Sequence, residues 1–149
     1  MRKSIIAVLL LAAAIYVAAF YKLFDREPMP APPKAFVEKN FIEVPVRIAS
    51  YSWGLGKEGD GSPWDVVKDE EAVPVPKQSV LTFSFEKEPE GAPQIRQVIS
   101  NEEHKVLETK SPYEIIVPET AGIYVYSISA SWKDGSAQYA VKVRVKDSP

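Results

Sequence analysis

The 149-residue chain contains no cysteine and only one histidine. Without cysteine it cannot form a disulfide, carry a lipid on a thiol, bind zinc through thiolates or use a thiol nucleophile. A disulfide typically contributes about 2–4 kcal/mol to a small exported domain. A domain of this kind must therefore obtain that stability from packing.

Catalytic motifs are also missing. His104 lies in the polar run 101–105, and a catalytic histidine needs a hydroxyl nucleophile and an orienting acid near it. The sequence has no Gly-x-Ser-x-Gly element to supply that nucleophile. We therefore interpret His104 as a solvated loop residue and expect a protein that is not an enzyme, with no cofactor and no metal site.

The charge balance becomes mildly acidic once the N-terminal segment is set aside. Arg2, Lys3 and Lys22 flank an apolar run, which leaves 15 basic against 20 acidic residues, a net charge of about −5. Such a balance gives no electrostatic footprint for phosphate backbones. Nucleic acid is therefore not an expected partner.

Residues 5–21 form an uncharged apolar run. As a helix this run spans about 26 Å, and about 30 Å if Leu23 and Phe24 continue it, which matches one bilayer crossing. The positive-inside rule predicts a cytoplasmic N-terminus and an extracytoplasmic domain in a single-pass cell-membrane protein. A cleaved signal peptide is the alternative, because residues 17–19 are small enough for cleavage. No polar stretch precedes that site, which favours an anchor over residues 1–24.

Residues 25–40 are rich in proline, with Pro-Met-Pro-Ala-Pro-Pro at 28–33. This composition favours an extended polyproline conformation and predicts a spacer of about 20 Å. Residues 41–149 remain for a single domain.

Period-two alternation of apolar and polar residues predicts strands within 41–149. The alternation is clearest at residues 42–48, 80–86 and 124–132. Pro45 places the first of these strands at a sheet edge or a bulge. Shorter strands are predicted at residues 94–99, 105–109 and 113–117.

Asp134-Gly135 predicts a tight hairpin turn, with Gly135 at positive φ, between the strand at 124–132 and a return strand that reaches Val145. No stretch of 41–149 has a convincing 3.6-residue period. Several short strands separated by turns therefore predict an all-β antiparallel sandwich.

Gly122-Ile123-Tyr124 resembles the corner of immunoglobulin-like domains, where a tyrosine hydroxyl reaches back to the backbone. The resemblance implies that Tyr124 is the corner tyrosine. It also implies that Tyr126 stands where antibody domains place their second cysteine, and that Trp53 or Trp132 is the core tryptophan. The expected fold class is an immunoglobulin-like β-sandwich preceded by one N-terminal transmembrane helix.

A wider resemblance covers residues 42–146. It rests on Ser50-Tyr51-Ser52-Trp53, Leu81-Thr82-Phe83 and Ala121-Gly122-Ile123-Tyr124, together with Trp132, Gly135 and Tyr139. This combination resembles an extracytoplasmic module of membrane-anchored and lipoprotein-type surface proteins of low-GC Gram-positive bacteria. Such modules have no assigned catalytic activity, so the resemblance implies fold and location only.

The interval 54–71 reads as a long glycine-rich loop that contains Asp60 and Asp65. Long loops of compact domains are often binding sites. The acids lack the spacing of an EF-hand calcium loop, and glycoside hydrolysis would need two carboxylates across a cleft. Trp64 could stack on a sugar ring or anchor a protein partner, or it could fold back over the open end of the sandwich.

Three functional hypotheses follow. The first is a membrane-tethered, non-enzymatic module that binds a protein partner at the cell surface through a sheet edge or the loop 54–71. The second is a cell-wall or carbohydrate-binding module that uses Trp64 with Asp60 and Asp65. The third is a protease inhibitor-like domain that presents a loop.

Overall fold

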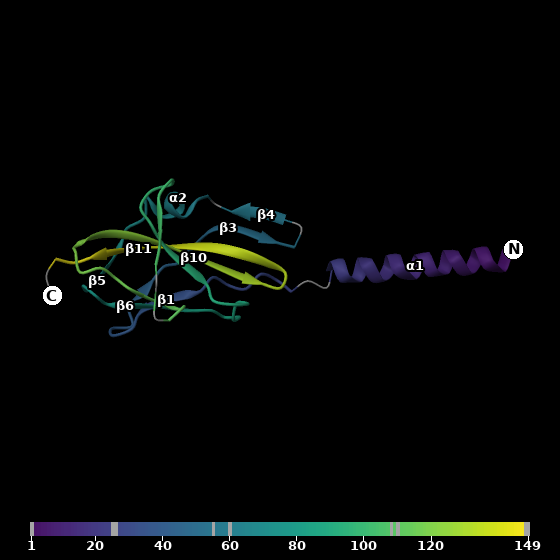
Figure 1. The fold of residues 1–149 in the computed structure, drawn as a ribbon, viewed down its shortest axis with the longest axis horizontal. Helices are drawn as coiled ribbons and strands as arrows, with labels where there is room; N and C mark the ends of the chain where they lie inside the picture. The colour runs from purple at the N-terminus through teal and green to yellow at the C-terminus, as the bar shows by residue number, and fades with distance from the viewer. Residues whose placement is uncertain are drawn as a thin grey trace.

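The structure is a computed structural model that describes residues 2–24, 27–54, 56–59, 61–107, 109 and 111–147. Helix α1 (Arg2–Phe24) precedes a β-rich region and projects from one end of it (Figure 1). The stretch Arg2–Tyr21 has a mean hydropathy of 2.4 and none of it is buried. The predicted apolar N-terminal helix is therefore confirmed, as a segment that fits an anchor and a signal sequence equally well.

The β-rich region consists of two antiparallel sheets. The small sheet has the order β2–β1–β6–β9, formed by β1 (Lys34–Val37), β2 (Glu43–Val44), β6 (Val80–Ser84) and β9 (Glu114–Ile116). The large sheet has the order β4–β3–β11–β10–β7–β8, formed by β3 (Arg47–Trp53), β4 (Gly56–Gly59), β7 (Gln94–Val98), β8 (His104–Val106), β10 (Gly122–Trp132) and β11 (Gly135–Val145). A short strand, β5 (Val73–Val75), pairs in parallel with the end of β11.

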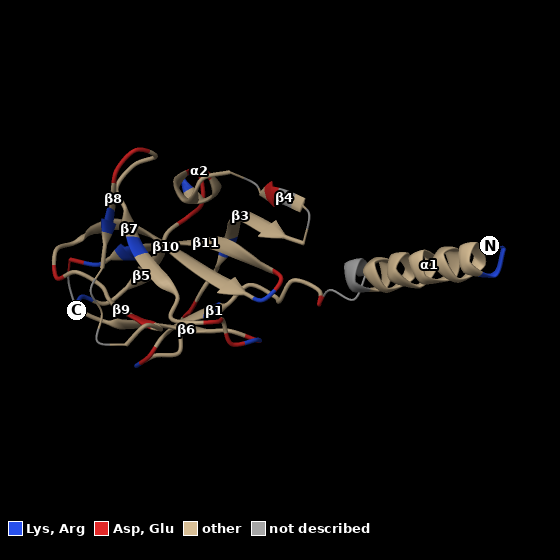
Figure 2. Ribbon diagram, turned by 45° about the vertical axis from the view of Figure 1, so that its right-hand side comes forward, with Lys and Arg blue, Asp and Glu red and all other residues tan. Residues whose placement is uncertain are grey.

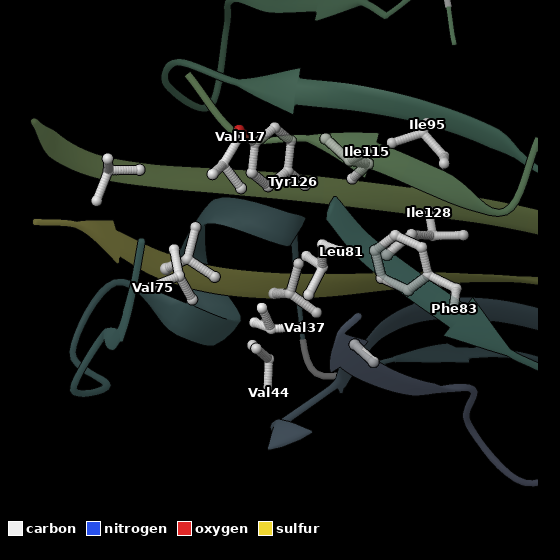
Figure 3. Close-up of a cluster of buried hydrophobic side chains, with 14 residues drawn as sticks. Val37, Val44, Val75, Leu81, Phe83, Ile95, Ile115, Val117, Tyr126 and Ile128 are labelled. Carbon is white, nitrogen blue, oxygen red and sulfur yellow. The ribbon is translucent and has the colours of Figure 1, made fainter. Parts of the chain in front are cut away.

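The main core lies between the two sheets (Figure 3). Alternate side chains of β10 and β11 face this core and pack against side chains of the small sheet. The large sheet contributes Tyr126, Ile128, Val141 and Val143, and the small sheet contributes Val37, Leu81, Phe83 and Ile115. Burial of each such side chain contributes about 1.5–3 kcal/mol. The predicted antiparallel, sandwich-like packing is therefore confirmed.

The predicted strand at 42–48 is two strands in different sheets. Residues 43–44 form β2 of the small sheet, and β3 of the large sheet begins at Arg47. Pro45 separates them because it has no N–H group with which to continue a ladder. The chain changes sheets at this point.

The hairpin between β10 and β11 also differs from the prediction. Its two turn residues are Lys133 and Asp134, and Gly135 is the first residue of β11, paired with Trp132. The described glycines with positive φ do not include Gly135. A Cβ atom there would overlap the Ser52 backbone oxygen and lie 2.7 Å from Cε3 of Trp53. Glycine at this position therefore allows close approach of β3 to β11.

Residues 27–33, which we call the strap, lie against the β-rich region. The Glu27 N–H donates to Oδ2 of Asp134 at 3.2 Å, and the indole N–H of Trp53 donates to the Glu27 carbonyl at 2.8 Å. Pro30 and Pro33 are buried, and β1 follows directly at Lys34. The packed region therefore begins before residue 41, in the segment where the composition predicted a spacer. Proline loses little conformational freedom on folding, so such a segment can pack as readily as it can span.

Candidate functional site

About half of the interval 54–71 is regular structure, so it is not one long loop. It contains β4 and a short helix, α2 (Pro63–Val67), which begins after Ser62. The Ser62 hydroxyl accepts a hydrogen bond from the Asp65 N–H at 3.2 Å, and Pro63 occupies the first helical turn. Both features are typical helix starts. Asp60, one of the predicted binding residues, lies outside the described residues.

Asp65 holds α2 to a neighbouring loop. Its carboxylate accepts hydrogen bonds from the Asn101 amide at 3.2 Å and the Ser62 hydroxyl at 3.0 Å, and Lys68 approaches it at 3.4 Å. These hydrogen bonds, with Asn101 the strongest influence, hold the pKa of Asp65 below its usual value of 3.8. The contacts give Asp65 a structural role at the start of α2.

Trp64 is half-buried on the outer face of the large sheet, which is the face turned away from the small sheet. Together with Val66 it packs against a second cluster that contains Val67, Val98, Val125 and Ala140. Among the described residues its ring has no aromatic partner. Trp64 therefore folds back onto the domain, over this sheet face, and Val125 is buried as a member of the same cluster.

Lys142 fixes the other end of α2. Its Nζ donates to three backbone carbonyls, those of Val67 at 3.1 Å, Lys68 at 2.9 Å and Glu70 at 2.8 Å. A cation at a helix C-terminus satisfies carbonyls that have no partner inside the helix. One side chain of β11 thus ties α2 to the sheet.

The outer face that α2 leaves open carries polar residues in cross-strand rows. The strand register aligns Ser50, Gln138, Ser129 and Gln94 in one row and Ser52, Ser136 and Ser131 in the next. β10 itself has no charged residue, and its ribbon is tan throughout in Figure 2. Together these rows line an open hollow of about 670 Å³, which we call the polar groove.

Two amides in the polar groove are held by hydrogen bonds. Ser50 Oγ donates to Oε1 of Gln138 at 3.2 Å, and Nη2 of Arg96 donates to Oε1 of Gln94 at 2.9 Å. The described lining residues also include Glu58 and Glu90 but no basic side chain. The Tyr51 hydroxyl donates to Glu58 at 2.9 Å. The groove can thus offer hydroxyl and amide groups to a ligand.

The sequence pattern does not reveal this groove, because its residues come from separate strands. Along the strand at 124–132, the alternation alone places Ser129 and Ser131 on the face opposite the core and says nothing of their neighbours. Only the register, which sets Ser129 beside Gln138 and Gln94, shows that polar groups from four strands converge. The signal available in the sequence was the serine alternation shared by 50–52 and 127–131.

The residues predicted to be structural lie at the two ends of β10. The Tyr124 hydroxyl donates to the Thr120 carbonyl at 2.8 Å, and Gly122 lies beside the Tyr124 ring. Trp132 is 5% exposed and its indole N–H donates to the Lys87 carbonyl at 3.0 Å. Trp53 is half-buried, with its ring centroid 6.0 Å from that of Trp132. Of the two candidate core tryptophans, Trp132 is the buried one.

Other titratable groups lie apart from the groove. His104 is exposed on the edge strand β8 rather than in a loop. Burial raises the pKa of Tyr139 to about 12, and its hydroxyl has no hydrogen-bond partner among the described residues. Burial also raises the pKa of Tyr126. Within the described ranges, no three histidine, aspartate or glutamate side chains gather as a metal ion would require.

Comparisons with known proteins add no family to these observations: no family model, curated protein or solved structure matches the chain. The resemblance of residues 42–146 to Gram-positive surface modules therefore stays a prediction.

Proposed function

We propose that the protein is a membrane-tethered, non-enzymatic binding module with an immunoglobulin-like sandwich outside the cytoplasm. The observation that carries this proposal is the docked strap. Glu27 is bound to Asp134 and Trp53 only three residues after α1 ends at Phe24. Three residues span at most about 11 Å. A retained α1 would thus hold the sandwich at the membrane surface.

Further contacts hold the strap, residues 27–33, against the β-rich region. Besides the two hydrogen bonds of Glu27, the Ala31 N–H donates to Oε2 of Glu86 at 3.2 Å, and Lys87 forms an ion pair with the Glu27 carboxylate. Buried Pro30 and Pro33 lie between the Glu27 contacts and β1. Exposed pairs contribute only a few tenths of a kcal/mol each, but several of them on a proline-stiffened segment act together. The end with the Lys133–Asp134 turn would be the one nearest the membrane.

The immunoglobulin-like assignment is supported by the corner at Tyr124. Its hydroxyl binds a carbonyl four residues upstream, at the start of a long core strand, which is the arrangement of a tyrosine corner. Two packed antiparallel sheets and a buried Trp132 are consistent with it. The helix α2 on the outer face is an addition to that plan.

Binding, rather than catalysis, is the function that the polar groove supports best. Its described side chains are hydroxyls, amides and two carboxylates spread along an open sheet face. Such groups recognise a ligand by hydrogen bonds, and the large sheet presents them on its outer face. We place ligand recognition in the polar groove instead of at Trp64.

Membrane tethering is tested by fractionation of cells that express the full chain. We expect the protein in the membrane fraction after an alkaline carbonate wash, with an intact mass that includes residues 1–24. Leu11→Arg places a charge near the middle of α1, which costs about 2.5–3.5 kcal/mol of insertion free energy, and should move the protein out of that fraction. A soluble product that begins after Ala18 or Ala19 would contradict the tether and indicate a signal peptide.

A further inference from the structure

We propose that the polar groove binds an uncharged glycan chain laid across strands β3, β11, β10 and β7. This inference rests on the proposed binding function and names the ligand class of the same groove. It assigns recognition to the two cross-strand rows, whose members are Ser50, Gln138, Ser129 and Gln94 in one row and Ser52, Ser136 and Ser131 in the other.

The spacing of the rows suits a ligand with many hydroxyl groups. Neighbouring strands lie about 4.8 Å apart, and residues two apart on one strand are about 6.8 Å apart, so the rows form a grid of polar groups. A serine hydroxyl both donates and accepts, and so does a glutamine amide. A chain of sugar rings presents hydroxyls of the same dual character along its length, which matches this grid.

The glutamine amides are already oriented toward one role. Oε1 of Gln138 accepts from Ser50, and Oε1 of Gln94 accepts from Arg96. Each Nε2 group, which has no partner among the described residues, is the group left to donate to a ligand. Because these amides are held before binding, less side-chain freedom is lost on complex formation.

Charge at the groove selects against anionic ligands. Glu58 and Glu90 are exposed lining residues and give the described lining a net negative charge, although the Arg96 guanidinium lies beside it and donates to Oε1 of Gln94. An anionic polymer would be repelled, whereas an uncharged chain would not. A protein partner is also a poorer fit, because protein hot spots use tryptophan, tyrosine and arginine, and the two rows contain only serine and glutamine.

The test is calorimetric titration of the full chain in lipid nanodiscs with two uncharged hexasaccharides, cellohexaose and chitohexaose. Hexagalacturonate serves as the anionic counterpart. We expect saturable binding of at least one uncharged hexamer and no measurable binding of hexagalacturonate. Ser129→Val and Gln138→Leu should each weaken the binding about tenfold, the usual loss for a hydrogen bond to a ligand. The matched control Ser84→Val, on an exposed position of β6, should leave it unchanged.

Two further measurements make the result decisive. Thermal unfolding of each variant shows whether a loss of binding is a loss of fold. If Ser129→Val does not fold, Glu90→Lys at the exposed rim provides the second variant, which should allow hexagalacturonate to bind. The absence of binding to either uncharged hexamer, or equal binding by wild type, Ser129→Val and Gln138→Leu, would overturn the inference. Because the chain is reconstituted directly, this outcome is independent of whether cells retain α1.

Discussion

Gly135 provides the sharpest test of how β3 and β11 meet. In Gly135→Ala the new Cβ would overlap the Ser52 backbone oxygen and lie 2.9 Å from Cα of Trp53. Both obstacles are backbone atoms, so no side-chain rotation relieves the clash, and the two strands must separate. Overpacking of this kind costs about 1–3 kcal/mol. For a domain of this size each kcal/mol corresponds to about 4 °C, so we expect the thermal midpoint to fall by about 4–12 °C.

Gly56→Ala is the matched control, because Gly56 and Gly135 flank the same residue, Trp53, on opposite strands. A Cβ at Gly56 would lie 3.6 Å from the Trp53 carbonyl, an ordinary contact. Its stability should therefore change by no more than about 0.5 kcal/mol. The assay is thermal unfolding of the full chain in detergent, followed by near-ultraviolet circular dichroism of the tryptophans. Equal midpoints for the two variants would refute the close approach of the strands at Gly135.

Further predictions concern polar groups whose partners differ. Tyr124→Phe should lower the unfolding free energy by about 1 kcal/mol because it removes the corner hydrogen bond. Tyr139→Phe should raise the unfolding free energy by about 1 kcal/mol because that buried hydroxyl has no partner among the described residues. Urea titrations in which both changes had the same sign would contradict the assignment. Lys142→Met should cost about 2–3 kcal/mol in the same assay, since three carbonyls lose a charged donor, and the exposed Lys146→Met should cost almost nothing. Asp65 has a lowered pKa, so its carboxylate binds a proton less readily in the folded protein than in the unfolded chain. The stability that the wild type gains over Asp65→Asn should therefore be present above pH 3.8 and vanish as the pH falls through the folded pKa. A stability difference that did not depend on pH would contradict this role.

The long strands β10 and β11 could be predicted from the sequence because their alternation is complete on one buried face. Ile128, Val141 and Val143 each occupy a core position that the period-two pattern assigned. The same pattern failed at residues 42–48, where alternation continues across Pro45 although the chain leaves one sheet for the other. The local alternation shows which side chains are apolar, but it does not show with which strand they pair.

Helix α2 could have been found from local signals. Ser62-Pro63 followed by Asp65 is a capping residue, a favoured first helical residue and an acid in the first turn. The helix was missed because five residues are too few for a 3.6-residue period to show. Its position on the sheet, set by Lys142 and by the packing of Trp64, depends on contacts far apart in sequence.

The polar groove and the strap could not be predicted from the sequence for a different reason, which is that their contacts join residues far apart in the chain. Ser50 and Gln138 are 88 residues apart, and Glu27 and Asp134 are 107 residues apart. A proline-rich segment has the same composition whether it packs against a domain or serves as an extended spacer, because proline restricts the backbone but does not determine its contacts. Asp134-Gly135 predicts a turn for a similar reason: the sequence shows a glycine but not the neighbouring strand β3 that requires it.

Energy transfer to the lipid surface tests most directly the claim that the strap holds the sandwich at the membrane. The chain has no cysteine, so Lys133→Cys and Lys77→Cys can each carry a single donor dye, in the full chain reconstituted in vesicles with acceptor-labelled headgroups. The first site lies at the turn before β11 and the second lies beyond its far end, where Lys77 pairs with Asp147; an eleven-residue strand separates them by about 34 Å. We predict strong transfer from position 133 and weak transfer from position 77. Equal transfer from both positions would show a freely moving domain and contradict the account.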